Sequence, residues 1–73
     1  MKITLENTTK MVQLNGVPAR IWEGKTESGI RVHAFITQIG VPDGEDQTQF
    51  QRELKETKAP SAEVAVYPMR MVL

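Results

Sequence analysis

The dipeptide Asn15-Gly16 is the feature of this sequence that most restricts its fold. Asn-Gly between two runs of alternating apolar and polar residues is a strong hairpin signal, because a type I′ turn needs positive φ at both central positions. The flanking runs are residues 11–14 and 17–22. The turn then predicts the pairing of the two strands: Leu14 with Val17, Val12 with Ala19, and Met11 with Arg20.

A second hairpin is expected between residues 21–23 and 30–37, with Ser28-Gly29 as its turn. The predicted pairs are Glu27 with Ile30, Lys25 with Val32, Trp22 with Phe35, and Ile21 with Ile36. Opposed residues share a face of the sheet. One face is then apolar and forms the predicted core: Val12, Leu14, Val17, Ala19, Ile21, Val32, Ala34 and Ile36. A register shifted by one residue would mix apolar and charged side chains on both faces.

The rest of the chain predicts one helix and one more strand. Asp43 or Asp46 can cap a helix that runs to about residue 57, with acidic residues in its first turn and Phe50 and Leu54 docking it on the sheet. The apolar tail, residues 63–73, is expected to form one strand that is kinked or split at Pro68, and the polar residues 7–9 a turn. The fold class is therefore α+β, a single domain over residues 1–73. Its sheet is mostly antiparallel with four to five strands, and the one helix lies between the meander and the C-terminal strand.

Composition excludes several classes of function. Nine basic and nine acidic residues give a net charge of zero, whereas general nucleic-acid binding needs a basic excess. Cysteine is absent and His33 is the only histidine, so neither a metal site nor a cofactor is expected. No residue pattern places a nucleophile beside His33, and the five glycines fit no phosphate-binding loop. We expect a non-enzymatic protein with no membrane span and no secretion signal, hence a cytoplasmic one.

The second face of the predicted meander carries the residues best suited to bind a ligand. It collects Met11, Gln13, Arg20, Trp22, Thr26, Arg31, His33, Phe35 and Thr37. Arginine suits phosphate or carboxylate, aromatic rings offer stacking surfaces, and histidine forms hydrogen bonds near neutral pH. The same face could instead be an aromatic pair under the helix, or an interface between subunits. Arg70, between two methionines, belongs either to a gap-filling strand or to a strand packed across such an interface.

Four stretches of the sequence resemble short uncharacterised accessory proteins of tailed phages and prophages. They are residues 2–10, 15–24, 27–36 and 68–71, so the resemblance covers most of the chain. It implies action against a bacterial host, in the cytoplasm of the infected cell. One mode is an oligomeric sponge that sequesters a nucleotide immune signal. The alternatives are a module that inhibits a host protein and a structural or assembly component of the phage.

The leading hypothesis is therefore a counter-defence homo-oligomer that binds a small nucleotide-like ligand. Arg20, Arg31 and Lys25 would meet phosphate, Trp22 or Phe35 would stack on the base, and His33 would donate or accept a hydrogen bond. The predicted ligand-binding residues are Arg20, Trp22, Lys25, Arg31, His33, Phe35 and Arg70.

Overall fold

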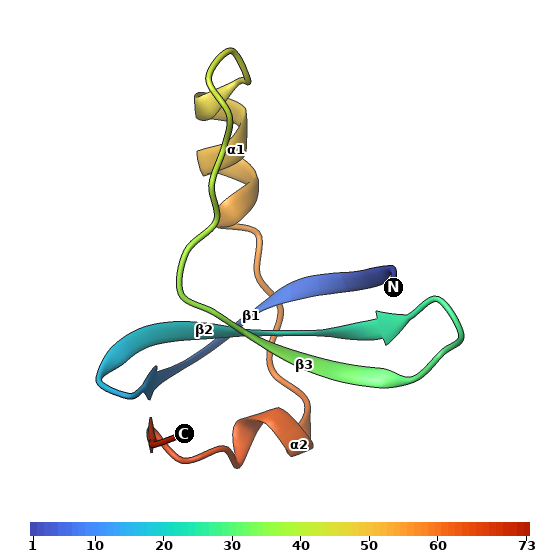
Figure 1. The fold of residues 1–73 in the computed structure, drawn as a ribbon, viewed down its shortest axis with the longest axis vertical. Helices are drawn as coiled ribbons and strands as arrows, with labels where there is room; N and C mark the ends of the chain where they lie inside the picture. Colours follow the sequence, from blue (N-terminus) through green and yellow to red (C-terminus); the bar gives the residue numbers. More distant parts are fainter.

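The computed structural model describes residues 1–73 and has a four-stranded sheet with two short helices (Figure 1). The elements are β1 (Ile3–Leu14), β2 (Val17–Thr26), β3 (Arg31–Ile36), α1 (Gln47–Leu54), α2 (Ala62–Ala65) and β4 (Arg70–Met71). The strands lie in the order β3-β2-β1-β4, and β4 runs parallel to β1 while the other neighbours are antiparallel. The α+β class is confirmed. The sheet is mixed, with two antiparallel pairs and one parallel pair; it has four strands and no fifth, and there are two helices instead of one.

The first hairpin forms as its turn predicts. Asn15 and Gly16 have φ values of 51° and 82°, the left-handed region that a type I′ turn requires. Leu14 pairs with Val17, and the three predicted pairs of this hairpin are confirmed.

The second hairpin is shifted by one residue from the prediction. Its loop has three residues instead of two, because Thr26 N donates to Ile30 O at 2.9 Å and closes the ladder there. Gly29, at φ 94°, is the left-handed third residue that ends such a loop. The observed pairs are Ile21 with Phe35, Trp22 with Ala34, Glu23 with His33, and Lys25 with Arg31.

This shift reverses the two faces of β3. Phe35 and His33 share a face with Ile21, and the predicted core residues of β3 lie on the other face: Val32, Ala34 and Ile36. The buried apolar core is small: Val12, Ala19, Ile21 and Val64. Leu14, Phe35, Tyr67 and Met71 pack around it. The core thus lies on the face of the sheet that α2 covers.

Residues 7–9 continue β1 instead of forming a turn. The register changes between Asn7 and Met11, where three residues of β1 lie opposite the single residue Ile21. Two backbone bonds join this bulge to a distant segment: Lys58 N donates to Asn7 O, and Thr9 N to Lys58 O, both at 3.0 Å. The Asn7 side chain donates to Leu54 O at 2.8 Å. The bulge therefore holds the point at which the chain returns from α1.

Residues 37–57 form an arm that rises from the sheet, with α1 on its returning limb (Figure 1). Asp46 caps α1 by accepting from Gln49 N at 2.8 Å, as expected, but the first turn contains no acidic residue. No residue of α1 is buried. The radius of gyration, 13.3 Å, exceeds the roughly 11 Å of a compact chain of this length. The arm therefore stands partly free of the sheet.

The C-terminal tail is only in part a strand. Ser61 caps α2 by accepting from Val64 N at 3.3 Å, so residues 62–65 are helical where a strand was expected. Only residues 70–71 are extended, beside β1. Neither helix has the length and apolar character needed to cross a bilayer.

Candidate functional site

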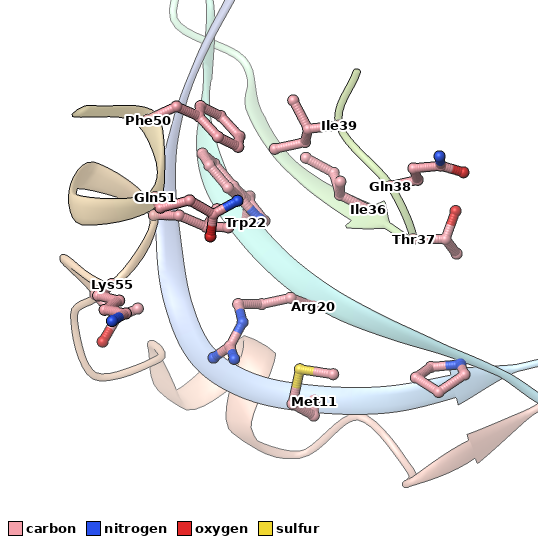
Figure 2. A pocket seen from close by; sticks show the side chains of 13 residues that line it. Met11, Arg20, Trp22, Ile36, Thr37, Gln38, Ile39, Phe50, Gln51 and Lys55 are labelled. Carbon is pink, nitrogen blue, oxygen red and sulfur yellow. The ribbon is translucent and has the colours of Figure 1, made fainter. Parts of the chain in front are cut away.

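The largest hollow lies between the arm and the sheet, on the face opposite the core. We call it the arm cleft; its volume is about 730 Å³, and Figure 2 shows the side chains that line it. They come from β1, β2, the end of β3 and the arm: Met11, Pro18, Arg20, Trp22, Ile36, Thr37, Gln38, Ile39, Phe50, Gln51, Leu54, Lys55 and Thr57.

Two periodicities bring the aromatic and basic residues into this cleft. Arg20 and Trp22 are two residues apart on β2 and so project from the same face of the sheet. Phe50 and Leu54 are four residues apart on α1 and so share one side of the helix. Phe50 and Trp22 point toward one another in Figure 2, and both are half-buried. The cleft thus offers two aromatic surfaces, one from the sheet and one from the arm.

The charge of the arm cleft is positive. Arg20 and Lys55 line it, and no carboxylate does. Neither cation forms an ion pair, since the one ion pair of the chain joins Arg31 to Glu63. Arg20 Nη1 donates to Thr8 O at 3.0 Å, which fixes the guanidinium beside the bulge and leaves its other donors unengaged. These groups can stack on a flat ring and pair with an anion attached to it.

A second hollow lies on the other side of the contact between α1 and the sheet. It shares Trp22, Phe50 and Leu54 with the arm cleft, but its charged residues are mainly acidic: Glu6, Glu53, Glu56 and Lys58. Its volume is about 540 Å³. The buried side chain of Asn7 also reaches it, with an Oδ1 that has no hydrogen-bond partner. An anionic ligand is therefore favoured on the arm-cleft side of Trp22.

Three of the predicted ligand residues lie elsewhere, in a polar groove of about 390 Å³ on the core face. They are Lys25, Arg31 and His33. Glu63 neutralises Arg31, and His33 Nδ1 lies 3.0 Å from the Tyr67 hydroxyl. The prediction that Arg31 and His33 share a face with Arg20 and Trp22 is wrong, because the three-residue loop turns the side chains of β3 to the opposite faces.

Glu23 is the titratable group of this groove whose pKa is clearly shifted. Its carboxylate accepts from Ser61 N at 2.8 Å. Hydrogen bonding from Ser61, the hydroxyl first and then the backbone, lowers the pKa of Glu23 against a smaller opposing effect of desolvation. The positive charges of Lys58 and His33 lower it further. Glu23 thus stays ionised and binds the start of α2 to the sheet.

The remaining two predicted residues line none of these three hollows. Phe35 packs edge-to-face on Tyr67, with ring centroids 5.2 Å apart, beside the core. Arg70 is exposed on β4, opposite Gln13. Phe35 is therefore not available as a stacking surface in the arm cleft.

The arm contributes residues to the cleft that the sequence pattern does not assign to a site. Phe50 and Leu54 are predicted only to dock the helix, yet both line the cleft, and so does Lys55. The available signal was the spacing of Phe50 and Leu54, which places a second apolar stripe against the sheet.

Comparisons of this chain with family models, curated proteins and solved structures found no match. Function must therefore be inferred from the geometry of the arm cleft.

Proposed function

We propose that the protein is a non-enzymatic, homo-oligomeric binding protein that sequesters a small nucleotide-like ligand in the arm cleft. The observation that carries this proposal is the lining of the cleft, which combines Trp22 and Phe50 with Arg20 and Lys55 and contains no carboxylate. The setting, counter-defence by a phage in the cytoplasm of its host, is supported by the resemblance of the sequence to short phage and prophage proteins.

The ligand's ring would lie between Trp22 and Phe50, and its phosphate would meet Arg20 and Lys55. The cleft's 730 Å³ falls within the roughly 300–1,000 Å³ of small-molecule sites. An aromatic contact contributes about 0.5–1.5 kcal/mol beyond its buried area. A hydrogen bond to a charged group contributes about 1.5–3 kcal/mol. Two contacts of each kind are enough for a specific site on a small protein.

Trp22 supplies the test, because it is the only tryptophan and lies in the proposed site. Titration with mono-, di- and cyclic nucleotides should quench its fluorescence saturably for at least one of them. Lys55→Gln should weaken that nucleotide about tenfold, the effect of losing roughly 1.4 kcal/mol of ion pairing. The Lys55 side chain makes no hydrogen bond or ion pair, and the substitution keeps the backbone bond that ends α1, so the sheet should stay intact.

Two matched variants serve as controls. Lys58→Gln removes the same charge from outside the arm cleft, and Arg31→Ala removes a cation from the polar groove. Both should leave the affinity unchanged. Loss of binding in Arg31→Ala, with Lys55→Gln unaffected, would move the ligand to the polar groove. No quenching by any nucleotide would reject the nucleotide ligand altogether.

A second function, inhibition of a host protein by direct contact, is favoured by a different observation. The C-terminal segment carries four strongly exposed apolar side chains: Val66, Met69, Val72 and Leu73. Contiguous exposed apolar surface is typical of protein-binding sites. Val72→Asp should release a host protein recovered with the wild-type chain and leave nucleotide quenching unchanged. If Val72→Asp instead abolishes the quenching and retains the host protein, the assignments of the arm cleft and of the C-terminal segment are both wrong.

A further inference from the structure

The outer edge of β3 is a row of backbone groups without partners. β3 is the last strand of the sheet, and its residues make no backbone hydrogen bond outside the ladder with β2. Thr26 N bonds to Ile30 O, so every second residue after Ile30 also bonds to β2. The residues between them direct their N–H and C=O groups outward: Arg31, His33 and Phe35.

This edge lacks the features that keep edge strands from pairing. Proteins protect such strands with a central lysine, a proline, a bulge or a covering segment. β3 contains one charged residue, Arg31, at its first position. Its register with β2 is regular from one end to the other. The other five residues of β3 are half-buried although no strand covers them.

The side chains of β3 are complementary to those of a second β3 related by two-fold symmetry about Ala34. In that antiparallel pairing Ala34 meets Ala34 of the second copy, Val32 meets Ile36, and His33 meets Phe35. Each pair is apolar or aromatic, and such cross-strand pairs each contribute about 0.2–1 kcal/mol. Arg31 falls at the end of the ladder, opposite Thr37, where water reaches it. The chain's net charge of zero adds no long-range repulsion.

The neighbouring symmetric register, about His33, fits less well. It sets His33 against its own copy and Arg31 against Phe35, so that only the pairs of Val32 with Ala34 are apolar. It also leaves Ile36 opposite no residue of the second β3.

We propose that two copies of this chain pair antiparallel through β3 about Ala34 and form one continuous eight-stranded sheet. This inference rests on the homo-oligomer of the proposed function and assigns its interface.

Single-cysteine variants test the pairing, because the chain contains no cysteine. Ala34 would be a non-hydrogen-bonded pair with Cα atoms about 4.5 Å apart, within the 4.4–6.8 Å that a disulfide spans. Ala34→Cys should therefore form a covalent dimer under mild oxidation, reversed by reductant. His33→Cys is the matched control. Its two cysteines would be diagonal, about 7–8 Å apart, and should stay unlinked.

Native mass spectrometry of the wild-type chain and of two further variants completes the test. Val32→Lys, on the β3 edge, should abolish the dimer with an unchanged circular dichroism spectrum. Val17→Lys, an exposed apolar residue of β2, should leave the dimer intact. Cross-linking of His33→Cys in place of Ala34→Cys would overturn the register. If the wild-type chain is a dimer but neither cysteine variant cross-links, the chain is an oligomer and the β3 interface is wrong. If the wild-type chain is a monomer, the β3 interface and the homo-oligomer are both wrong. Nucleotide quenching of Trp22 is read separately in each case.

Discussion

The two helices differ in a way that their lengths do not explain. α2 has four residues, and its Val64 is fully buried against the sheet. α1 has eight residues and buries none of them. α2 lies across the core face, close to Ile21, whereas α1 meets the opposite face only at its edge, through Phe50 and Leu54. The position of a helix over the sheet, rather than its length, decides how much it stabilises the fold.

The arm is attached mainly by polar bonds at its root. Asn7 binds Leu54 O through its side chain and Lys58 N through its backbone. Few apolar contacts hold the arm beyond this point, so it should open locally at a lower free energy than the sheet. A binding cleft between a stable sheet and a loosely held arm can admit a ligand without unfolding the core.

The largest expected effect separates the two faces of the sheet. Ile21 is 0% exposed and lies at the centre of the core. Ile21→Ala should cost about 2–5 kcal/mol by loss of burial and creation of a cavity. That is a large part of the roughly 4–11 kcal/mol expected for a chain of this size. Leu54→Ala removes a half-buried leucine of the arm and should cost under about 1 kcal/mol.

Urea unfolding followed by circular dichroism measures both variants. Hydrogen exchange adds a second readout, since Leu54→Ala should speed exchange in α1 without affecting β2. Equal losses of stability in the two variants would show that the arm unfolds cooperatively with the core. The two faces of the sheet would then contribute equally to stability, contrary to the prediction.

The sequence predicted those parts of the fold that depend on short-range rules. The Asn15-Gly16 turn and the Asp46 cap are each determined within four residues, and both are confirmed. The same holds for one half of the core face, since Val12, Ala19 and Ile21 follow from the first turn. These elements are local because their geometry needs no information from the rest of the chain.

The errors came from one loop and from the tail. The prediction takes Ser28-Gly29 as a two-residue turn, whereas the loop has three residues. The difference shifts the register of β3 by one residue and so places His33 and Phe35 on the wrong face. Hydrophobicity favoured the wrong register because Val32, Ala34 and Ile36 are apolar, although they lie on the sheet face opposite Ile21 and the core. The predicted ligand residues are therefore divided: Arg20 and Trp22 line the arm cleft, and Lys25, Arg31 and His33 line the polar groove.

The tail illustrates how tertiary contacts override β-propensity. Its Val-Ala-Val run is typical of strands, yet Ser61 and Glu63 are suited to the N-cap and first turn of a helix. Helix formation places Val64 over Ile21, which buries both side chains completely. A strand through the same residues would have no such contact, so the burial of one valine decides the local conformation.

A smaller effect is expected in the bulge that joins the two regions. Thr8 is 0% exposed; its hydroxyl donates to Ile21 O at 2.5 Å and accepts from Lys10 N at 3.2 Å. Thr8→Val keeps the shape and leaves both backbone groups without a partner, which should cost about 1–3 kcal/mol. Thr9→Val, one residue on and exposed, is the matched control and should be near neutral. A neutral Thr8→Val in urea unfolding would mean that water replaces the hydroxyl in the bulge.

The smallest effect concerns the bond between α2 and the sheet. Because the folded-state pKa of Glu23 lies below its ordinary value of 4.5, ionised Glu23 stabilises the fold above that pH. The contribution is lost as pH falls through the lowered pKa, when the protonated carboxyl accepts more weakly from Ser61. Glu23→Gln lacks this titration and should be slightly less stable than wild type at about pH 7. The two should converge in acid, below the lowered pKa of Glu23, since the other carboxylates titrate alike in both chains. Urea midpoints measured across this range test the prediction. A difference that stays constant with pH would assign the effect of Glu23 to its packing rather than to its charge.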